Sequence, residues 1–127
     1  MLEMKKIKTK INFQDERGKI IDLLEKQNIN AITFISQKKG KVRGNHYHKK
    51  TIQWNYLLKG KITIYSKIKN QKTKPITLNP GDLVLTSKHE SHAIKAIQNC
   101  EFLVFTQGPR GGKEYENDTY RLKKPLI

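Results

Sequence analysis

The sequence predicts an all-β domain, a sandwich or a barrel, and two observations favour it. Short segments in which apolar and polar residues alternate recur at spacings of about eight to twelve residues, with turn-forming residues between them. No window has the periodicity of a three-turn amphipathic helix, and residues 22–27 offer one turn at most. At 127 residues the chain has the length of one domain and can bury a core without disulfides.

Turn signals separate the expected strands. The dipeptide Lys59-Gly60 ends one strand, and residues 79–82, Asn-Pro-Gly-Asp, form a strong turn signal because proline presets φ and glycine accepts a positive φ. Residues 108–127, which begin with Gly-Pro-Arg-Gly-Gly, are expected to form a tail that packs over the barrel or against a second subunit. The expected strands cover residues 20–24, 31–35, 53–58, 61–65, 76–78, 83–85, 92–97 and 102–106.

The charge of the chain is strongly positive. Lysine and arginine number 26 against 11 acidic residues, a formal net charge of +15. Basic side chains that neutralise phosphates drive nucleic-acid affinity, but 22 of the 26 are lysines spread along the chain, and arginine is the residue that contacts base edges bidentately. We therefore expect no nucleic-acid partner, and a positive field that attracts small anions such as nucleotide diphosphates.

Cysteine content and hydropathy favour a cytoplasmic protein. Cys100 is the single cysteine, lies in an apolar run, and is interpreted as a buried small hydrophobe rather than a reactive thiol. Residues 1–8 carry charges without the apolar stretch of a secretory signal. No run of about twenty apolar residues is present, so we expect no membrane span.

Histidines supply the candidate site. His46 and His48 are two residues apart and project from the same face of a strand. Gln53 and His92 join them only if the sheet curls into a barrel. Three imidazoles and one amide oxygen suit Zn, Fe, Mn, Ni or Co, so these four residues are candidate metal ligands. Glutamine is a weaker ligand than a carboxylate, and a site that works without metal is the alternative.

The spacing of Gly40, His46-Tyr47-His48, Gln53 and Gly60 resembles the first motif of the cupin superfamily, with Gln53 where glutamate is usual. Gly81 and His92 match the second motif. In that motif Ser87, His89 and Ala96 replace the usual proline, glycine and asparagine.

The resemblance implies a cupin double-stranded β-helix, a jelly-roll barrel. Residues 1–127 then form a single domain with its barrel core at about residues 12–106, and the two terminal segments pack on the barrel or on a dimer mate. A small barrel has exposed edge strands that need cover, so we expect a homodimer.

Two further segments, Asp15-Glu16-Arg17-Gly18 and Arg43-Gly44-Asn45-His46-Tyr47-His48, resemble the nucleotide-sugar branch of the cupins. This branch contains the dTDP-4-dehydrorhamnose 3,5-epimerases and the dTDP-sugar 3,4-ketoisomerases, and His48 and Gln53 are as in the ketoisomerases. The resemblance covers about residues 12–106. It implies deoxysugar biosynthesis, a nucleotide diphosphate sugar as the anionic substrate, and chemistry that needs no metal.

The same resemblance implies roles for individual residues. His46 would be the general base on the carbon beside a keto group, and His48 would handle the other proton. A neutral imidazole with a pKa near 6.5 suits proton abstraction next to a carbonyl. Arg17 and Arg43 would contact the diphosphate or the sugar. Arg43 lies three residues from His46, and only a β-bulge, which Gly44 could supply, puts both on one face.

Strand alternation adds weaker candidates. Asn55 shares the face of Gln53, so it is a candidate substrate-binding residue, whereas Trp54 and Tyr56 are expected to be structural. Candidates for stacking on a base or donating a proton are Tyr65 and Tyr47.

The sequence thus predicts a nucleotide-sugar ketoisomerase or epimerase that acts on a 4-keto-6-deoxyhexose by histidine acid/base proton transfer. One alternative is a metal-dependent cupin, such as a dioxygenase, a sugar-phosphate isomerase or a decarboxylase, with Zn, Fe, Mn or Ni held by His46, His48 and His92. Another is a sugar-binding cupin without catalysis.

Overall fold

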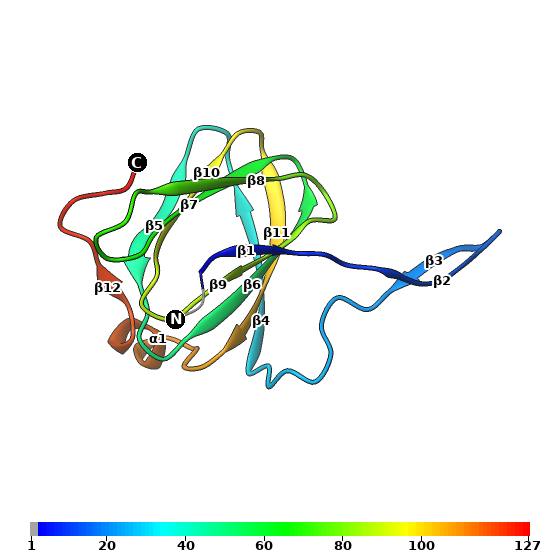
Figure 1. Ribbon diagram of the computed structural model, residues 1–127, viewed down its shortest axis with the longest axis horizontal. Coiled ribbons are helices and arrows are strands. Elements are labelled where there is room, and N and C mark those ends of the chain that lie inside the picture. The colour runs from blue at the N-terminus through cyan, green and yellow to red at the C-terminus, as the bar shows by residue number, and fades with distance from the viewer. Residues whose placement is uncertain (1–2) are drawn as a thin grey trace.

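The computed structural model describes residues 3–127, and two antiparallel five-stranded sheets form its barrel (Figure 1). Met1 and Leu2, which begin the segment expected not to be a secretory signal, lie outside the described residues. The first sheet contains, in spatial order, β1 (Lys5–Ile7), β9 (Leu83–Thr86), β6 (Ile52–Lys59), β11 (Cys100–Gln107) and β4 (Ala31–Gln37). The second contains β12 (Tyr120–Arg121), β5 (Val42–Tyr47), β10 (Ser91–Ala96), β7 (Ile62–Lys67) and β8 (Lys74–Leu78).

The core lies between the two sheets, because alternate side chains of each strand point inward. β11 shows this pattern, with every second residue from Cys100 to Thr106 buried. Cys100 lies in the core, as the sequence predicted. The jelly-roll fold class is confirmed, and the predicted strands from residue 31 onward coincide with β4 and β6 to β11 within a few residues. The main apolar cluster comprises Met4, Leu57, Ile62, Ile64, Leu78, Val84, Ala96, Cys100, Phe102 and Val104.

The N-terminal part differs from the prediction. Strands β2 (Ile11–Asp15) and β3 (Gly18–Ile21) pair only with each other and project from the barrel as a hairpin, which we call the arm (Figure 1). The barrel core therefore does not start at residue 12, because the first strand that joins a barrel sheet is β1 and the next is β4. Alternation in the sequence indicates that a segment is a strand but does not say which sheet it joins.

Residues 22–30, between β3 and β4, form neither helix nor strand, so the single helical turn expected at residues 22–27 is absent and the strand expected at 20–24 ends at Ile21. The helix in the described chain, α1 (Lys113–Asn117), lies instead in the tail. After it, β12 pairs with β5, so the tail extends the edge of the second sheet. Among residues 3–127, no helix is long and apolar enough to cross a membrane.

Candidate active site

The structure brings three imidazoles from distant parts of the chain together. His46 lies on β5, His48 directly follows it, and His92 lies on β10, opposite His46 in the register of the two strands. The ring centroid of His46 is 4.8 Å from those of both His48 and His92, and the last two centroids are 5.5 Å apart. One ring nitrogen from each histidine lies within 4.8 Å of the others.

A β-bulge in β5 decides which residues share this site. His92 pairs with His46 but Ala93 pairs with Gly44, so Asn45 is the extra residue, with φ of 58°. The bulge reverses the alternation, and Arg43 and His46 both line the same cavity. Gly44 has φ of 93°, and a Cβ there would lie 2.9 Å from the carbonyl oxygen of His92, so glycine suits the bulge.

The cavity has a volume of about 810 Å³. Gln53 and Asn55 from β6 line it, as their alternation predicts. Trp54, between them, packs in a separate apolar cluster with Leu83 and Leu85. The wall that the sequence did not predict comes from the tail. It consists of Arg110, Gly111, Gly112, Tyr115, Glu116, Thr119 and Arg121.

Hydrogen bonds to backbone carbonyls orient two of the rings. Nδ1 of His48 lies 2.9 Å from the carbonyl oxygen of Asp118, and Nδ1 of His92 lies 3.3 Å from that of Glu90. A carbonyl oxygen only accepts, so in each neutral ring Nδ1 carries the proton and Nε2 keeps a lone pair. Nε2 of His48 is buried and has no hydrogen-bond partner in the described chain. That nitrogen is available as a base or as a metal ligand.

Asp118 fastens the tail to the strand that carries the histidines. Its carboxylate accepts hydrogen bonds from the backbone N–H of Lys49 at 3.0 Å, from that of Lys50 at 3.1 Å and from Oγ1 of Thr51 at 2.7 Å. Burial raises the pKa of Asp118, but these hydrogen bonds together outweigh it, so the pKa lies below its usual value. Asp118 therefore fixes both the chain after His48 and, through its carbonyl, the His48 ring.

Burial keeps the three imidazoles neutral. Burial, followed by the positive charge that His48 and Arg121 can carry, lowers the pKa of His46 to about 4. Burial and the other two histidines lower the pKa of His92 to about 3. The pKa of His48 is lowered mainly by burial, although Asp118 opposes this. At neutral pH the site thus offers neutral imidazoles, which accept protons or bind metal ions.

Arginine is concentrated at this cavity. Arg43, Arg110 and Arg121 line it, although the chain has only four arginines against 22 lysines. Arg121 forms two hydrogen bonds of 3.1 Å with Glu116, and the Arg110 guanidinium lies 4.2 Å from the ring centroid of Tyr115. Planar guanidinium groups bind phosphate oxygens in pairs, so the cavity is equipped for an anion. Two arginines within the short tail of a lysine-rich chain are the signal that would have revealed this wall.

Arg17 and Tyr65, which the sequence placed among the substrate-binding residues, do not reach this cavity. Arg17 lies on the exposed arm, where its Nε donates to Asp15 at 2.9 Å. On β7, Ser66 is opposite His92, so Tyr65 points to the other face of the sheet. Tyr47 also points outward and stacks on Tyr120, with ring centroids 5.2 Å apart.

The barrel has the fold of solved sugar 3,4-ketoisomerases and of a dTDP-4-dehydrorhamnose 3,5-epimerase, as the resemblance predicted from the sequence implies. Residues 13–120 match the family described as the polysaccharide biosynthesis C-terminal domain, and the chain belongs to this family. No curated protein sequence matches the chain.

Solved structures similar to this chain include several sugar isomerases. A double mutant of the QdtA 3,4-ketoisomerase from Thermoanaerobacterium thermosaccharolyticum, in complex with TDP, is 27% identical, with a TM-score of 0.78 over 96% of this chain and 90% of that chain. The WlaRB TDP-quinovose 3,4-ketoisomerase from Campylobacter jejuni is 19% identical, with a TM-score of 0.81 over 96% and 95%. The dTDP-4-dehydrorhamnose 3,5-epimerase from Sulfolobus tokodaii is 18% identical, with a TM-score of 0.76 over 98% and 78%.

Proposed function

We propose that this protein is a nucleotide-sugar ketoisomerase or epimerase that acts on a 4-keto-6-deoxyhexose. The observation that carries the proposal is the juxtaposition of neutral histidines and arginines in one cavity of about 810 Å³. The fold is shared with QdtA, a sugar 3,4-ketoisomerase whose structure holds TDP. A cytoplasmic location remains our prediction.

The three arginines of the cavity supply the binding of the diphosphate. Arg110 and Arg121 come from the tail and Arg43 from the barrel, so an anion between them would hold the tail against the barrel. Gln53 and Asn55 are buried amides on the floor of the cavity and suit the hydroxyl groups of a sugar.

The histidines supply the proton transfer. In its neutral form His46 takes the proton from C3, next to the C4 carbonyl, and the electron pair forms an enediolate across C3 and C4. In ketoisomerisation the two protons that leave C3 and O3 return to C4 and O4, so the carbonyl moves to C3. Return of a proton to the opposite face of C3 is epimerisation. We assign the transfer of the second proton to His48, whose neutral Nε2 first accepts a proton and then returns it, and whose ring is fixed by Asp118.

The test is turnover of dTDP-4-keto-6-deoxyglucose in D₂O. We expect deuterium to enter the sugar ring at C3 or C4, and the His46→Asn variant to lose this exchange. The same 4-keto sugar attached to UDP is the control that shows whether the nucleotide matters. Absence of turnover and exchange across the common nucleotide 4-keto sugars would contradict the proposal, and tight binding without exchange would indicate a sugar-binding cupin.

A metal-dependent enzyme is the second candidate, and the Nε2 of buried His48, which has no hydrogen-bond partner among residues 3–127, favours it. His46, His48 and His92, with Gln53 as an oxygen ligand, fit Zn, Fe, Mn or Ni. Such an ion would polarise a substrate oxygen. Replacement of the usual carboxylate by Gln53 removes a charge that would hold the ion, so we propose a reaction without metal. Stoichiometric metal in protein purified without a His tag, with activity lost to EDTA, would favour the metal enzyme.

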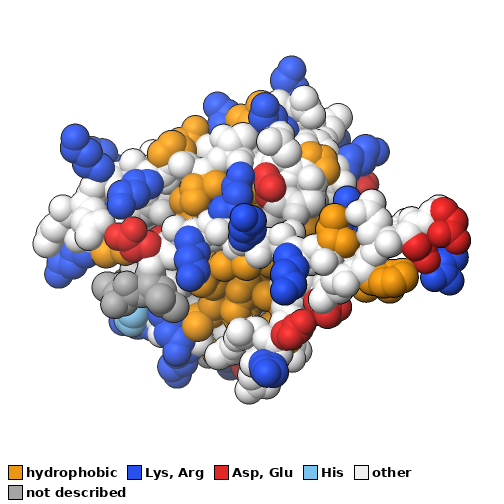
Figure 2. Space-filling view, turned by 45° about the vertical axis from the view of Figure 1, so that its right-hand side comes forward, with side chains coloured by type: hydrophobic (Ala, Val, Ile, Leu, Met, Phe, Trp, Pro, Cys, Tyr) orange, Lys and Arg blue, Asp and Glu red, His pale blue; other side chains and the backbone are white. Residues whose placement is uncertain are grey.

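We also propose a homodimer held together by the arm. β4 is an edge strand of its sheet and exposes Ile32 (63%) and Phe34 (57%), while the arm exposes Phe13 (52%) and Ile20 (58%). Figure 2 shows hydrophobic side chains gathered on the barrel surface and along the arm. An open strand edge and apolar side chains of this extent favour association. Because the arm points away from its own cavity, Arg17 can contact substrate only in the partner.

Light scattering coupled to size exclusion tests the homodimer. The wild type is expected to elute as a dimer, and Phe13→Asp with Ile20→Lys as a folded monomer. Lys69→Glu with Lys72→Glu, away from the arm, is the control. A monomeric wild type would contradict the proposal.

A further inference from the structure

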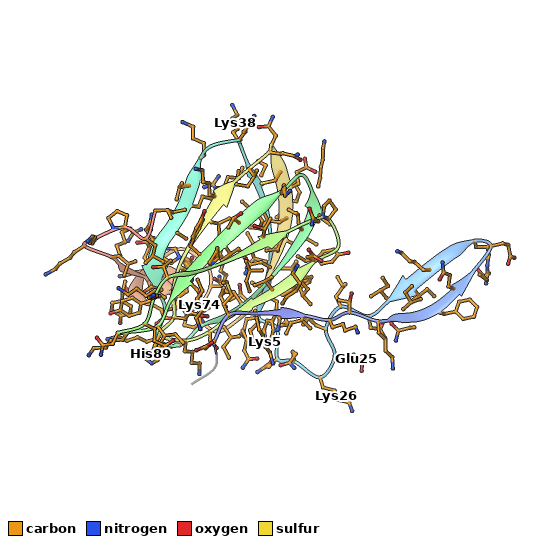
Figure 3. The ribbon with its side chains drawn as sticks, turned by 45° about the horizontal axis from the view of Figure 1, so that its top comes forward. Lys5, Glu25, Lys26, Lys38, Lys74 and His89 are labelled. Carbon is orange, nitrogen blue, oxygen red and sulfur yellow. The ribbon has the colours of Figure 1, made fainter. Side chains whose placement is uncertain are left out.

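The outer face of the second sheet has a cavity of its own, of about 710 Å³. It lies between β5, β7, β10 and the segment that follows β12, and four lysines line it: Lys49, Lys67, Lys69 and Lys124. His89 lies at its rim and is labelled in Figure 3. Neither the proposed reaction nor the arm uses this cavity.

Strand alternation separates this cavity from the histidine cavity by the thickness of one sheet. Ser66 pairs with His92, and the next residue, Lys67, pairs with Ser91, so Lys67 and Ser91 point outward. On β5, Tyr47 likewise points away from His46, and it forms the aromatic wall of the outer cavity. A ligand in the outer cavity therefore does not touch the substrate.

The charge of the outer cavity is positive and lacks a counter-charge. No acidic residue is among those described as lining it. None of its four lysines takes part in a salt bridge within residues 3–127. Lys49 lies 4.4 Å from the ring centroid of Tyr120, which holds its ammonium group beside the cavity. Like charges around a concave surface focus a positive potential and concentrate anions.

We propose that this cavity is a second anion-binding site, for a small oligophosphate. Ammonium groups on flexible stems surround phosphate oxygens as point charges, in contrast to the guanidinium forks of the histidine cavity. Four separate lysines match a ligand with several phosphate groups better than a single carboxylate. The proposal holds whether or not the histidine cavity turns over a sugar.

The test uses inorganic tripolyphosphate as the probe and isothermal titration calorimetry at constant ionic strength. A variant with Lys49→Gln, Lys67→Gln, Lys69→Gln and Lys124→Gln removes the charge of the outer cavity. The matched control, which has the same net charge, is Lys38→Gln, Lys39→Gln, Lys41→Gln and Lys59→Gln. Lys38 lies at the opposite end of the barrel from His89 (Figure 3).

We expect the wild type to bind tripolyphosphate, the cavity variant to bind at least about tenfold more weakly, and the control to stay within about twofold of the wild type. Equal weakening in both variants would mean that only the overall charge attracts the probe, and would overturn the proposal. Absence of wild-type binding would overturn it as well. So would loss of binding in Arg110→Gln with Arg121→Gln, because the probe would then occupy the histidine cavity.

Discussion

The barrel and the arm are built from the same kind of strand, but their apolar side chains have different surroundings. In the barrel, Phe102 on β11 is completely buried between two sheets. On the arm, Phe13 and Ile20 belong to an equally regular antiparallel pair and remain more than half exposed. The alternation of a strand therefore determines which side chains share a face, whereas burial depends on what the chain, or a second chain, brings to that face.

The barrel and the arm are expected to differ most in their contributions to catalysis. His46→Asn removes the base and is expected to reduce kcat by about 10² to 10⁴-fold, the usual contribution of a general base. Arg17→Gln on the arm leaves the chemistry intact and is expected to raise KM by about tenfold, through a lost phosphate contact in the dimer. Steady-state kinetics of both variants checks this, with circular dichroism as the control for folding. A large loss of kcat in Arg17→Gln would contradict the separation of roles.

Stability should show the same contrast. Phe102→Ala leaves a cavity in the core and is expected to cost about 3–5 kcal/mol of unfolding free energy. Phe13→Ala, measured at a concentration where the protein is monomeric, is expected to change it by less than about 0.5 kcal/mol, as for an exposed site. Urea unfolding of the two variants gives both values. A loss of several kcal/mol in Phe13→Ala would show that the arm packs on its own barrel.

Asp118 is the residue that joins the tail to the barrel, and its removal should affect both. Asp118→Ala leaves two backbone N–H groups and the Thr51 hydroxyl without their acceptor, at a cost of about 1–3 kcal/mol. The His48 ring would lose its fixed carbonyl partner as the tail shifts. The value of kcat should therefore fall by more than the fraction of protein that is unfolded at the assay temperature. Lys123→Gln, at an exposed tail residue that lines neither cavity, is the control. Unchanged kcat would contradict the positioning role.

The smallest effect concerns pH. Burial and neighbouring positive charge give His46 a pKa of about 4, so it stays unprotonated and kcat/KM should remain level from pH 8 to about 5. An ordinary histidine would lose activity below about 6.5. The pH profile of kcat/KM is the measurement, and an acid limb near 6.5 would contradict a buried base.

The lowered pKa values of the histidines also make the free energy of unfolding depend on pH. In the unfolded chain an imidazole binds a proton when the pH falls below about 6.5. In the folded protein His92 has a pKa of about 3 and stays unprotonated over this range. The folded state should therefore lose stability as pH falls from about 6.5 to 3, and His92→Gln should show a shallower loss.

The sequence predicted the barrel because its evidence is local. Alternation gave the strands, and the matched glycine spacings placed His46 and His48 on one face, with Gly44 at the bulge that turns Arg43 toward them. It did not predict Arg110, Tyr115 and Arg121, because α1 is too short to show a helical period and the pairing of β12 with β5 leaves no local pattern. The sequence also did not show that Arg17 lies away from the cavity of its own chain or that Tyr65 points to the other face of its sheet, because motif spacing carries no information on the direction of an arm or on the face of a distant strand.

The hydrogen bonds of Asp118 have a consequence for the order of folding. They join residues 67–70 positions apart, so closing them costs loop entropy unless the pairing of the barrel strands has already brought the two ends together. A folding intermediate can thus possess a complete jelly roll while its histidines are still exposed to water and have ordinary pKa values. Refolding followed by the fluorescence of Trp54, which packs in an apolar cluster outside the histidine cavity, should run ahead of the recovery of turnover.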